Sequence, residues 1–129
     1  MAERLARLLP ALWAGLLLAI AVVAAPAAFA ALPSADAGRV VGRMFIQEAW
    51  ASLLLAAWLL GWLRPRHAWL LWGTVACTLL GYFAVQPLMS AARAGQGMLS
   101  FGQLHMISTA FFGLKTLLVL ALAWRVTAS

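Results

Sequence analysis

Four long apolar runs, separated by short polar or glycine-rich stretches, dominate the pattern of the chain. Runs that approach or exceed about 18 apolar residues are typical of membrane-spanning helices. The predicted spans cover roughly residues 8–32, 44–63, 68–91 and 101–125. The connecting stretches are too short for an extramembrane catalytic domain, and short connections place consecutive helices antiparallel. We therefore predict an all-α integral membrane protein, a four-helix bundle with up-down connectivity and a single domain over residues 1–129.

The first and third runs carry helix-disturbing residues. Pro26 has no backbone N–H for the carbonyl of Val22, so we expect the first helix to be kinked there. Gln86 and Pro87 interrupt the far end of the third run. The first run is also similar to a secretory signal that ends in a cleavage-like triplet, Ala28-Phe29-Ala30. Because removal would leave three spans, we expect this helix to stay uncleaved.

Composition agrees with a protein embedded in lipid. The chain is 66% hydrophobic and 9% charged, whereas globular proteins contain about 25% charged residues. The net charge is +6, and the basic residues lie almost entirely at the ends of the apolar runs. This placement indicates membrane lipids, including anionic headgroups, as partners, and it argues against nucleic acid.

Basic residues also predict the orientation. The side with more arginine near the span ends is expected to face the cytoplasm. One side holds five arginines and the other holds three, namely Arg4, Arg7, Arg64, Arg66 and Arg125 against Arg39, Arg43 and Arg93. Most tryptophans fall toward the five-arginine side, as expected for interfacial anchors. We predict cytoplasmic N- and C-termini, in the inner (plasma) membrane of a bacterium.

Several polar residues fall in one layer toward the outer side. At a rise of about 1.5 Å per residue, Glu48, Gln86 and His105 lie about 8–11 Å from the midpoints of their predicted spans. Arg39 and Arg43 rim the same layer. Two interpretations stay open: a structural polar cluster near the interface, or a site that binds a solute or cation or relays a proton.

Several methionines at the same end of the bundle raise the alternative of a metal site. Thioether and imidazole ligands favour Cu(I), and the candidate ligands are His105, Met106, Met44, Met89 and Met98. The competing interpretation is that methionines fill irregular gaps between helices, and no Met-x-Met or His-x-x-Met spacing is present. A haem would have His105 and a methionine as its axial ligands. No cofactor is predicted, and copper(I) and haem are kept as alternatives.

Lys115 is a charged residue near the middle of the last run. Its predicted position is on the cytoplasmic side of the span midpoint, about 12 Å in depth from Glu48, so we expect no direct salt bridge between them. Its charge is explained by snorkelling toward the headgroups, by an internal cavity, or by an acidic residue of a partner subunit.

Two stretches carry a family resemblance. The first contains Gly15, Ala25-Pro26, Phe29, Leu32-Pro33 and the run from Arg39 to Phe45, and the second is Leu104-His105-Met106-Ile107-Ser108. The chain resembles the family called domain of unknown function 4149, or transmembrane protein 205-like. The resemblance implies a small four-span bundle without an established reaction, in which Pro26, Arg43 and His105 are family features. It also implies a link to platinum-drug resistance in a eukaryotic branch and a distant likeness to copper-resistance membrane proteins. Lys115 falls where the family is expected to have an uncharged residue.

The sequence lacks the usual catalytic motifs, including a nucleophile elbow, a phosphate loop and a zinc-binding helix motif. We therefore predict no enzymatic activity. The leading function is the handling or transport of a small solute or soft metal ion through the outer polar layer. The alternative is a structural accessory subunit of a larger membrane complex or a homo-oligomer, and the third is an integral-membrane enzyme or haem protein.

Overall fold

Four helical spans make up the part of the chain that the computed structural model describes, residues 1–97 and 99–128, with Phe101 described by its backbone alone. The first span joins α1 (Ala2–Leu18), the π-helical segment η1 (Ala19–Ala24) and α2 (Ala25–Ala31). The second is α3 (Ser34–Trp62), and the fourth is α6 (Phe101–Ala128). The third contains η2 (Pro65–His67), α4 (Ala68–Thr78), the π-helical η3 (Leu79–Ala84) and α5 (Val85–Arg93). All four are long and apolar enough to cross a membrane, and the prediction of an all-α four-helix bundle is confirmed.

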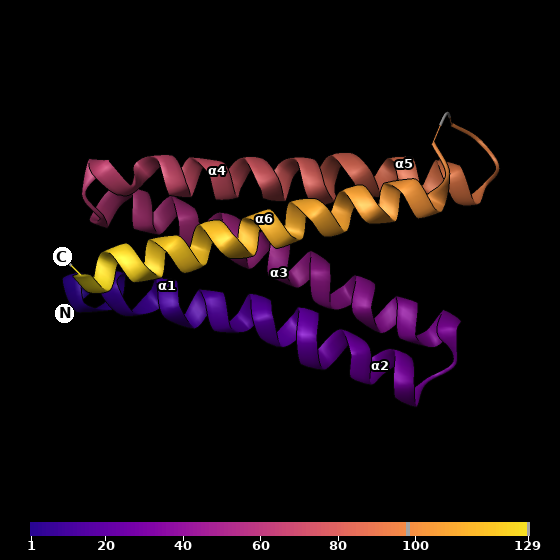
Figure 1. Ribbon diagram of the computed structural model, residues 1–129, viewed down its shortest axis with the longest axis horizontal. Helices are drawn as coiled ribbons and strands as arrows, with labels where there is room; N and C mark the ends of the chain where they lie inside the picture. Colours follow the sequence, from indigo (N-terminus) through magenta and orange to yellow (C-terminus); the bar gives the residue numbers. More distant parts are fainter. Residues whose placement is uncertain (98, 129) are drawn as a thin grey trace.

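The spans diverge from one end of the bundle to the other (Figure 1). We call the end that holds both termini and the turn at 63–64 the terminal end. The opposite end, with the connections at 32–33 and 94–100, is the open end. Helix α6 packs against α1, α4 and α5, while α2 packs against α3. Toward the open end the α2–α3 pair separates from the α5–α6 pair (Figure 1).

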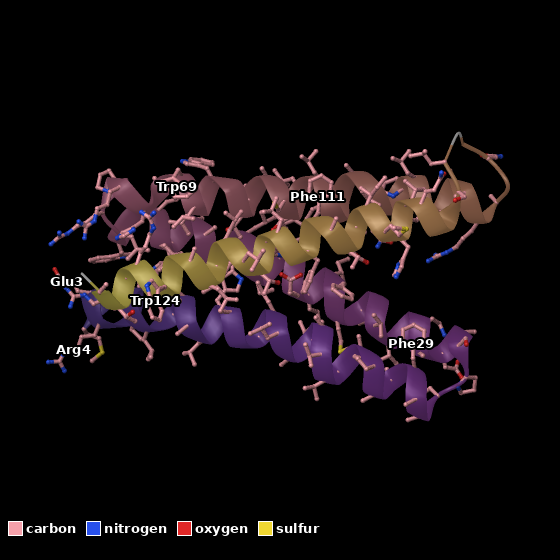
Figure 2. The ribbon with its side chains drawn as sticks, viewed as in Figure 1. Glu3, Arg4, Phe29, Trp69, Phe111 and Trp124 are labelled. Atoms are coloured by element: carbon pink, nitrogen blue, oxygen red, sulfur yellow. The ribbon has the colours of Figure 1, made fainter. Side chains whose placement is uncertain are left out.

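The main hydrophobic core lies in the terminal half, where all four spans meet. Its fully buried large side chains are Trp13, Leu17, Leu59, Leu70, Leu71, Leu122 and Val119. A smaller cluster near the open end joins α5 and α6, through Val85, Met89 and Leu104. The packing that holds the four spans together is therefore concentrated at one end. Figure 2 shows the side chains along the bundle.

Both spans that contain a proline also contain a π-helical segment. η1 ends just before Pro26, and η3 ends shortly before Pro87. A proline removes one helical hydrogen bond and crowds the preceding turn, and a wider π turn is a common response to such a disturbance. The first and third spans run in the same direction (Figure 1), and each is interrupted on its way from the packed half to the open half.

Helix α3 begins well before the apolar run that was used to place the second span. Its first residue is Ser34, directly after Pro33, and it continues without interruption to Trp62. Arg39 and Arg43 are therefore part of the same helix as the membrane span. Hydropathy marks where a helix becomes apolar, whereas the backbone helix continues until a breaker such as proline. As a result Glu48 lies at the middle of α3, with fourteen residues on each side.

Candidate functional site

A large cavity occupies the open half, between the diverging pairs of helices. Its volume is about 1010 Å³, and residues of all four spans line it. Much of the wall is apolar or small, including Ala25, Pro26, Phe29, Gly38, Gly42, Phe45, Gly81, Tyr82 and Phe112. Ser34 and Arg93 mark its open end, and Glu48, Cys77 and Lys115 mark its deep end. The cavity thus lies beside the two interrupted spans, whereas the dense core lies in the terminal half.

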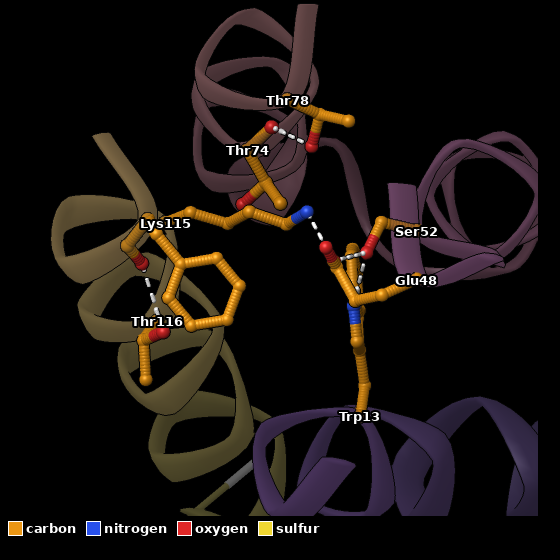
Figure 3. Close-up of polar contacts among 8 residues, drawn as sticks. Trp13, Glu48, Ser52, Thr74, Thr78, Lys115 and Thr116 are labelled. Carbon is orange, nitrogen blue, oxygen red and sulfur yellow. Dashed lines mark hydrogen bonds and ion pairs between the residues drawn. The ribbon is translucent and has the colours of Figure 1, made fainter. Parts of the chain in front are cut away.

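An ion pair lies at the deep end of this cavity. The ammonium of Lys115 donates to Oε1 of Glu48, and each side chain is only 3% exposed (Figure 3). The prediction that these two residues form no direct salt bridge is wrong. The error came from the span bounds: Glu48 is the middle residue of α3, and Lys115 is the fifteenth of the 28 residues of α6. The two charges therefore lie at the same level of the bundle.

The same carboxylate oxygen joins a hydrogen-bonded chain that reaches a third span. Trp13 Nε1 donates to Ser52 Oγ at 2.9 Å, and Ser52 Oγ donates to Glu48 Oε1 at 2.6 Å. Glu48 and Ser52 are four residues apart and so share one face of α3. Nζ of Lys115 also lies 5.9 Å from the ring centre of Phe112, three residues earlier in α6, within the range of a cation–π contact. The pair is thus fixed by α1, α3 and α6 together (Figure 3).

The hydroxyl groups of the third span make local bonds near this pair. Thr78 Oγ1 donates to the carbonyl of Thr74 at 2.9 Å, and Thr74 Oγ1 donates to that of Leu70 at 2.8 Å. Both bonds stay within the helix, a usual way for threonine to satisfy its hydroxyl in a transmembrane helix. Glu48 is the acidic partner that the structure gives Lys115 in the described part of the chain.

The other predicted binding residues divide into two groups. Gln86, His105 and Arg39 line the cavity together with Glu48. Arg39 also pairs with Asp36 in the first turns of α3. Arg43 is an exposed residue of α3 and is not part of the cavity wall that the structure describes.

The predicted copper ligands are mostly separated in space. Met89 is buried and lines the cavity with His105. Met106 is 73% exposed, and neither it nor the half-buried Met44 is in the described wall. Met98 lies outside the described residues. Within residues 1–97 and 99–128, no group of three or more His, Cys, Asp or Glu residues is placed to hold a metal ion. The copper(I) and haem alternatives stay predictions.

Sequence reasoning missed the ion pair and its supporting residues, Trp13 and Ser52. Glu48 and Ser52 are four residues apart, a spacing that marks a shared helix face. Counting α3 from the residue after Pro33 would have placed Glu48 at the level of Lys115. No comparable signal marks Trp13, because an indole in the first span was expected at the headgroups, yet its side chain is 1% exposed in the core.

Comparison with protein families identifies the family of the chain. The model of the family described as Domain of unknown function (DUF4149) matches residues 8–97, so the chain belongs to this family and the predicted resemblance is confirmed. The matched stretch contains Trp13, Glu48, Ser52 and both prolines of the π-helical junctions, and it ends before α6 and Lys115. Searches of curated proteins and of solved structures give no match.

Proposed function

We propose that this member of the DUF4149 family is a non-enzymatic membrane protein that takes a small solute into its cavity from the open end. The observation that carries the proposal is the cavity of about 1010 Å³ that ends on the buried Glu48–Lys115 pair. Pockets for small molecules measure about 300–1,000 Å³ and combine apolar walls with a few polar groups. Ionisable residues inside a membrane usually face such internal spaces and mark the path of a solute.

The contrast between the two halves supports binding at the deep end of the cavity, which we call its floor and which is closed by the terminal half. The terminal half has a continuous core of buried apolar side chains beneath the ion pair. A solute that enters from the open end would stop at Glu48 and Lys115, and its passage to the other side would require the terminal half to open. By the arginine distribution the open end faces the outside of a bacterial inner membrane, with both termini in the cytoplasm.

A small organic solute fits the cavity better than a soft metal ion. Of the predicted copper ligands, Met89 and His105 are in the described wall, whereas Cu(I) sites usually combine several thioether, thiolate or imidazole ligands. The interpretation as an accessory subunit remains a second prediction, which rests on small residues spaced four apart rather than on a contact within this chain. These residues are Ala11, Gly15 and Ala19 in the first span and Gly73, Cys77 and Gly81 in the third.

Filling the cavity tests the proposal. A Cβ added at Gly42 has no neighbouring atom within 4 Å, and Gly42 lines the cavity. Gly42→Phe should therefore place a ring in the cavity without disturbing the backbone. Gly61→Phe is the matched control, because Gly61 lies in the same helix, is equally unobstructed and is outside the described cavity wall.

The measurement is equilibrium dialysis of radiolabelled octanoate, 1-octanol and octylammonium against the protein in phosphatidylcholine nanodiscs, with protein-free nanodiscs subtracted. We expect at least one probe to bind saturably to the wild type and to Gly61→Phe. Gly42→Phe should weaken this binding by about tenfold or more, the effect of losing about 1.4 kcal/mol. Equal binding by all three proteins, or saturable binding of no probe, would contradict the proposal.

A further inference from the structure

The charges that line the cavity are mostly positive. Arg39, Arg93 and Lys115 line it, and Glu48 is the carboxylate among its described lining residues. Near the open end Arg39 pairs with Asp36, and at the floor of the cavity Lys115 pairs with Glu48. Among the described lining residues, three side chains thus carry a positive charge and one carries a negative charge. A cavity with low-dielectric walls and an excess of one charge attracts ions of the opposite charge.

The ammonium at the floor has donors for a second partner. An ammonium group carries three N–H donors, and among the described residues Glu48 Oε1 is the acceptor that Lys115 reaches. That oxygen already accepts from Ser52 as well. Lys115 is 97% buried by side-chain area and still lines the cavity, so an anionic group at the floor would meet a desolvated ammonium, where charge-assisted hydrogen bonds are strong.

The walls above the floor suit an apolar chain. The rings of Phe45 and Phe112 meet edge to face at 5.2 Å between centroids, and both line the cavity. Tyr82 and Phe29 belong to the same wall. Aromatic and small apolar residues bury a hydrocarbon body well. A solute complementary to the whole cavity has one anionic end and an apolar body.

We propose that the cavity binds an amphipathic organic monoanion, with its carboxylate-like head on Lys115 and its apolar body along Phe45 and Phe112. This inference rests on the proposed function and names the class of its solute. A cationic amphiphile is disfavoured, because its head would have to displace Lys115 from Glu48 in a cavity whose other permanent charges are arginines. A neutral amphiphile would contact the apolar walls but would not form an ion pair with the ammonium.

The geometry makes Glu48 a competitor of the ligand. Both the carboxylate of Glu48 and the head of the anion need the donors of Lys115. Removing the charge of Glu48 should therefore strengthen anion binding, and removing that of Lys115 should weaken it. A purely structural pair would give changes in the same direction, because either substitution would loosen the same contact. Glu48→Gln keeps the shape of the side chain and an oxygen acceptor for Ser52, and Lys115→Met keeps most of the apolar stem.

The test uses the three eight-carbon probes, octanoate, 1-octanol and octylammonium, in the same nanodisc dialysis. We expect the wild type to bind octanoate about tenfold more tightly than the other two probes, the size of effect that one charged hydrogen bond supplies. Octanoate affinity should rise about tenfold in Glu48→Gln and fall about tenfold in Lys115→Met. Arg4→Gln, the same kind of charge loss outside the described cavity wall, should leave the affinity unchanged.

The outcomes separate this inference from the proposed function. Tighter binding of octanol or octylammonium that Gly42→Phe still weakens would overturn the anion preference and keep a solute-binding cavity. Changes of the same sign in Glu48→Gln and Lys115→Met would overturn the competition. If no probe binds in a way that Gly42→Phe weakens, the proposed function fails as well. The comparison of three probes on the wild type does not depend on whether Lys115→Met folds.

Discussion

The terminal and open halves of this bundle are built from the same four spans but are held together differently. In the terminal half Leu59, Leu71 and Leu122 are fully buried against neighbouring spans. In the open half the same spans enclose a cavity, and a small cluster of α5 and α6 is the core that remains. The Glu48–Lys115 pair lies where one half meets the other. The contrast indicates that packing supplies the rigidity of the bundle and that the charges are kept at the edge of that packing.

The two hairpins of the chain reach this boundary in the same way. Each has an odd-numbered span with a π-helical segment before a proline, and an uninterrupted partner helix with an ionisable residue at its fifteenth position. The first hairpin contributes Glu48 and the second contributes Lys115. The pair therefore joins the two hairpins at the floor of the cavity.

Removal of one charge of the Glu48–Lys115 pair should lower the free energy of unfolding more than any other substitution considered below. Lys115→Met leaves the Glu48 carboxylate buried without its cation, and breaking a buried pair in this way costs about 3–5 kcal/mol. We expect the free energy of unfolding, measured by reversible titration with sodium dodecyl sulfate, to fall by about that amount. A loss below about 1 kcal/mol would mean that the pair behaves as a solvated one.

The double variant Glu48→Gln with Lys115→Met provides the control for this prediction. It removes both charges together, and replacing a whole buried pair by neutral groups is often close to neutral. Most of the stability lost in Lys115→Met should therefore return. If the double variant is as unstable as the single one, lost packing of the lysine stem rather than the unpaired charge explains the loss.

A core truncation should show how much the packing of the terminal half contributes to stability. Leu122 is fully buried in the terminal core, and Leu122→Ala should cost about 2–4 kcal/mol through lost contacts and the cavity it leaves. Leu117 lies on the same helix and is 64% exposed, so Leu117→Ala should cost under about 0.5 kcal/mol. Both values come from the same detergent titration. Equal costs would show that the buried side chains of the terminal half contribute no more to stability than its exposed ones.

Much of the fold followed from the sequence because lipid imposes a simple rule. A long apolar stretch in a bilayer satisfies its backbone polar groups only as a helix or in a closed barrel, so four apolar runs predicted four helices. The prolines predicted where the helices are irregular, since Pro26 and Pro87 each follow a π-helical segment. The predicted start near residue 44 was late, because the polar turns around Arg39 and Arg43 continue the helix without a breaker.

The site was only partly predictable from the same patterns. Glu48, Gln86 and His105 were expected in one layer, and all three line the cavity. Glu48, however, lies at the level of Lys115, whereas His105 precedes Lys115 by ten residues of α6, about 15 Å along the axis. The contact between Glu48 and Lys115 was missed, because a shift of a few residues in a span boundary moves a side chain by several ångströms along the axis. Which side of a helix faces a neighbour is also fixed by packing, as the burial of Trp13 illustrates. The ion pair and the burial of Trp13 can be predicted only once the four helices are placed relative to one another.

The glycine at a close contact between η3 and α6 tests how tightly the irregular third span is packed against the fourth. A Cβ built at Gly81 would lie 2.6 Å from the Cβ of Phe111, so η3 and α6 would have to move apart in Gly81→Ala. Overpacking of this kind costs about 1–3 kcal/mol. Gly42→Ala, whose Cβ meets open space, should be neutral or stabilising by up to about 1 kcal/mol through helix propensity. A Gly81→Ala protein as stable as Gly42→Ala would show that the two helices are not in close contact.

Loss of a single hydroxyl should give the smallest effect. Ser52 accepts from Trp13 and donates to Glu48, so Ser52→Ala removes two hydrogen bonds from the boundary while leaving the ion pair in place. Side-chain hydrogen bonds within membranes average about 0.6 kcal/mol and reach about 1.7, and we expect a cost of about 1 kcal/mol in the free energy of unfolding. The variant Trp13→Phe removes one of the same bonds along with part of the core contact, and the double variant should then lose less than the two single losses combined. A cost for Ser52→Ala near that of Lys115→Met would mean that the hydrogen-bonded chain, rather than the attraction of opposite charges, holds the boundary between the packed half and the cavity.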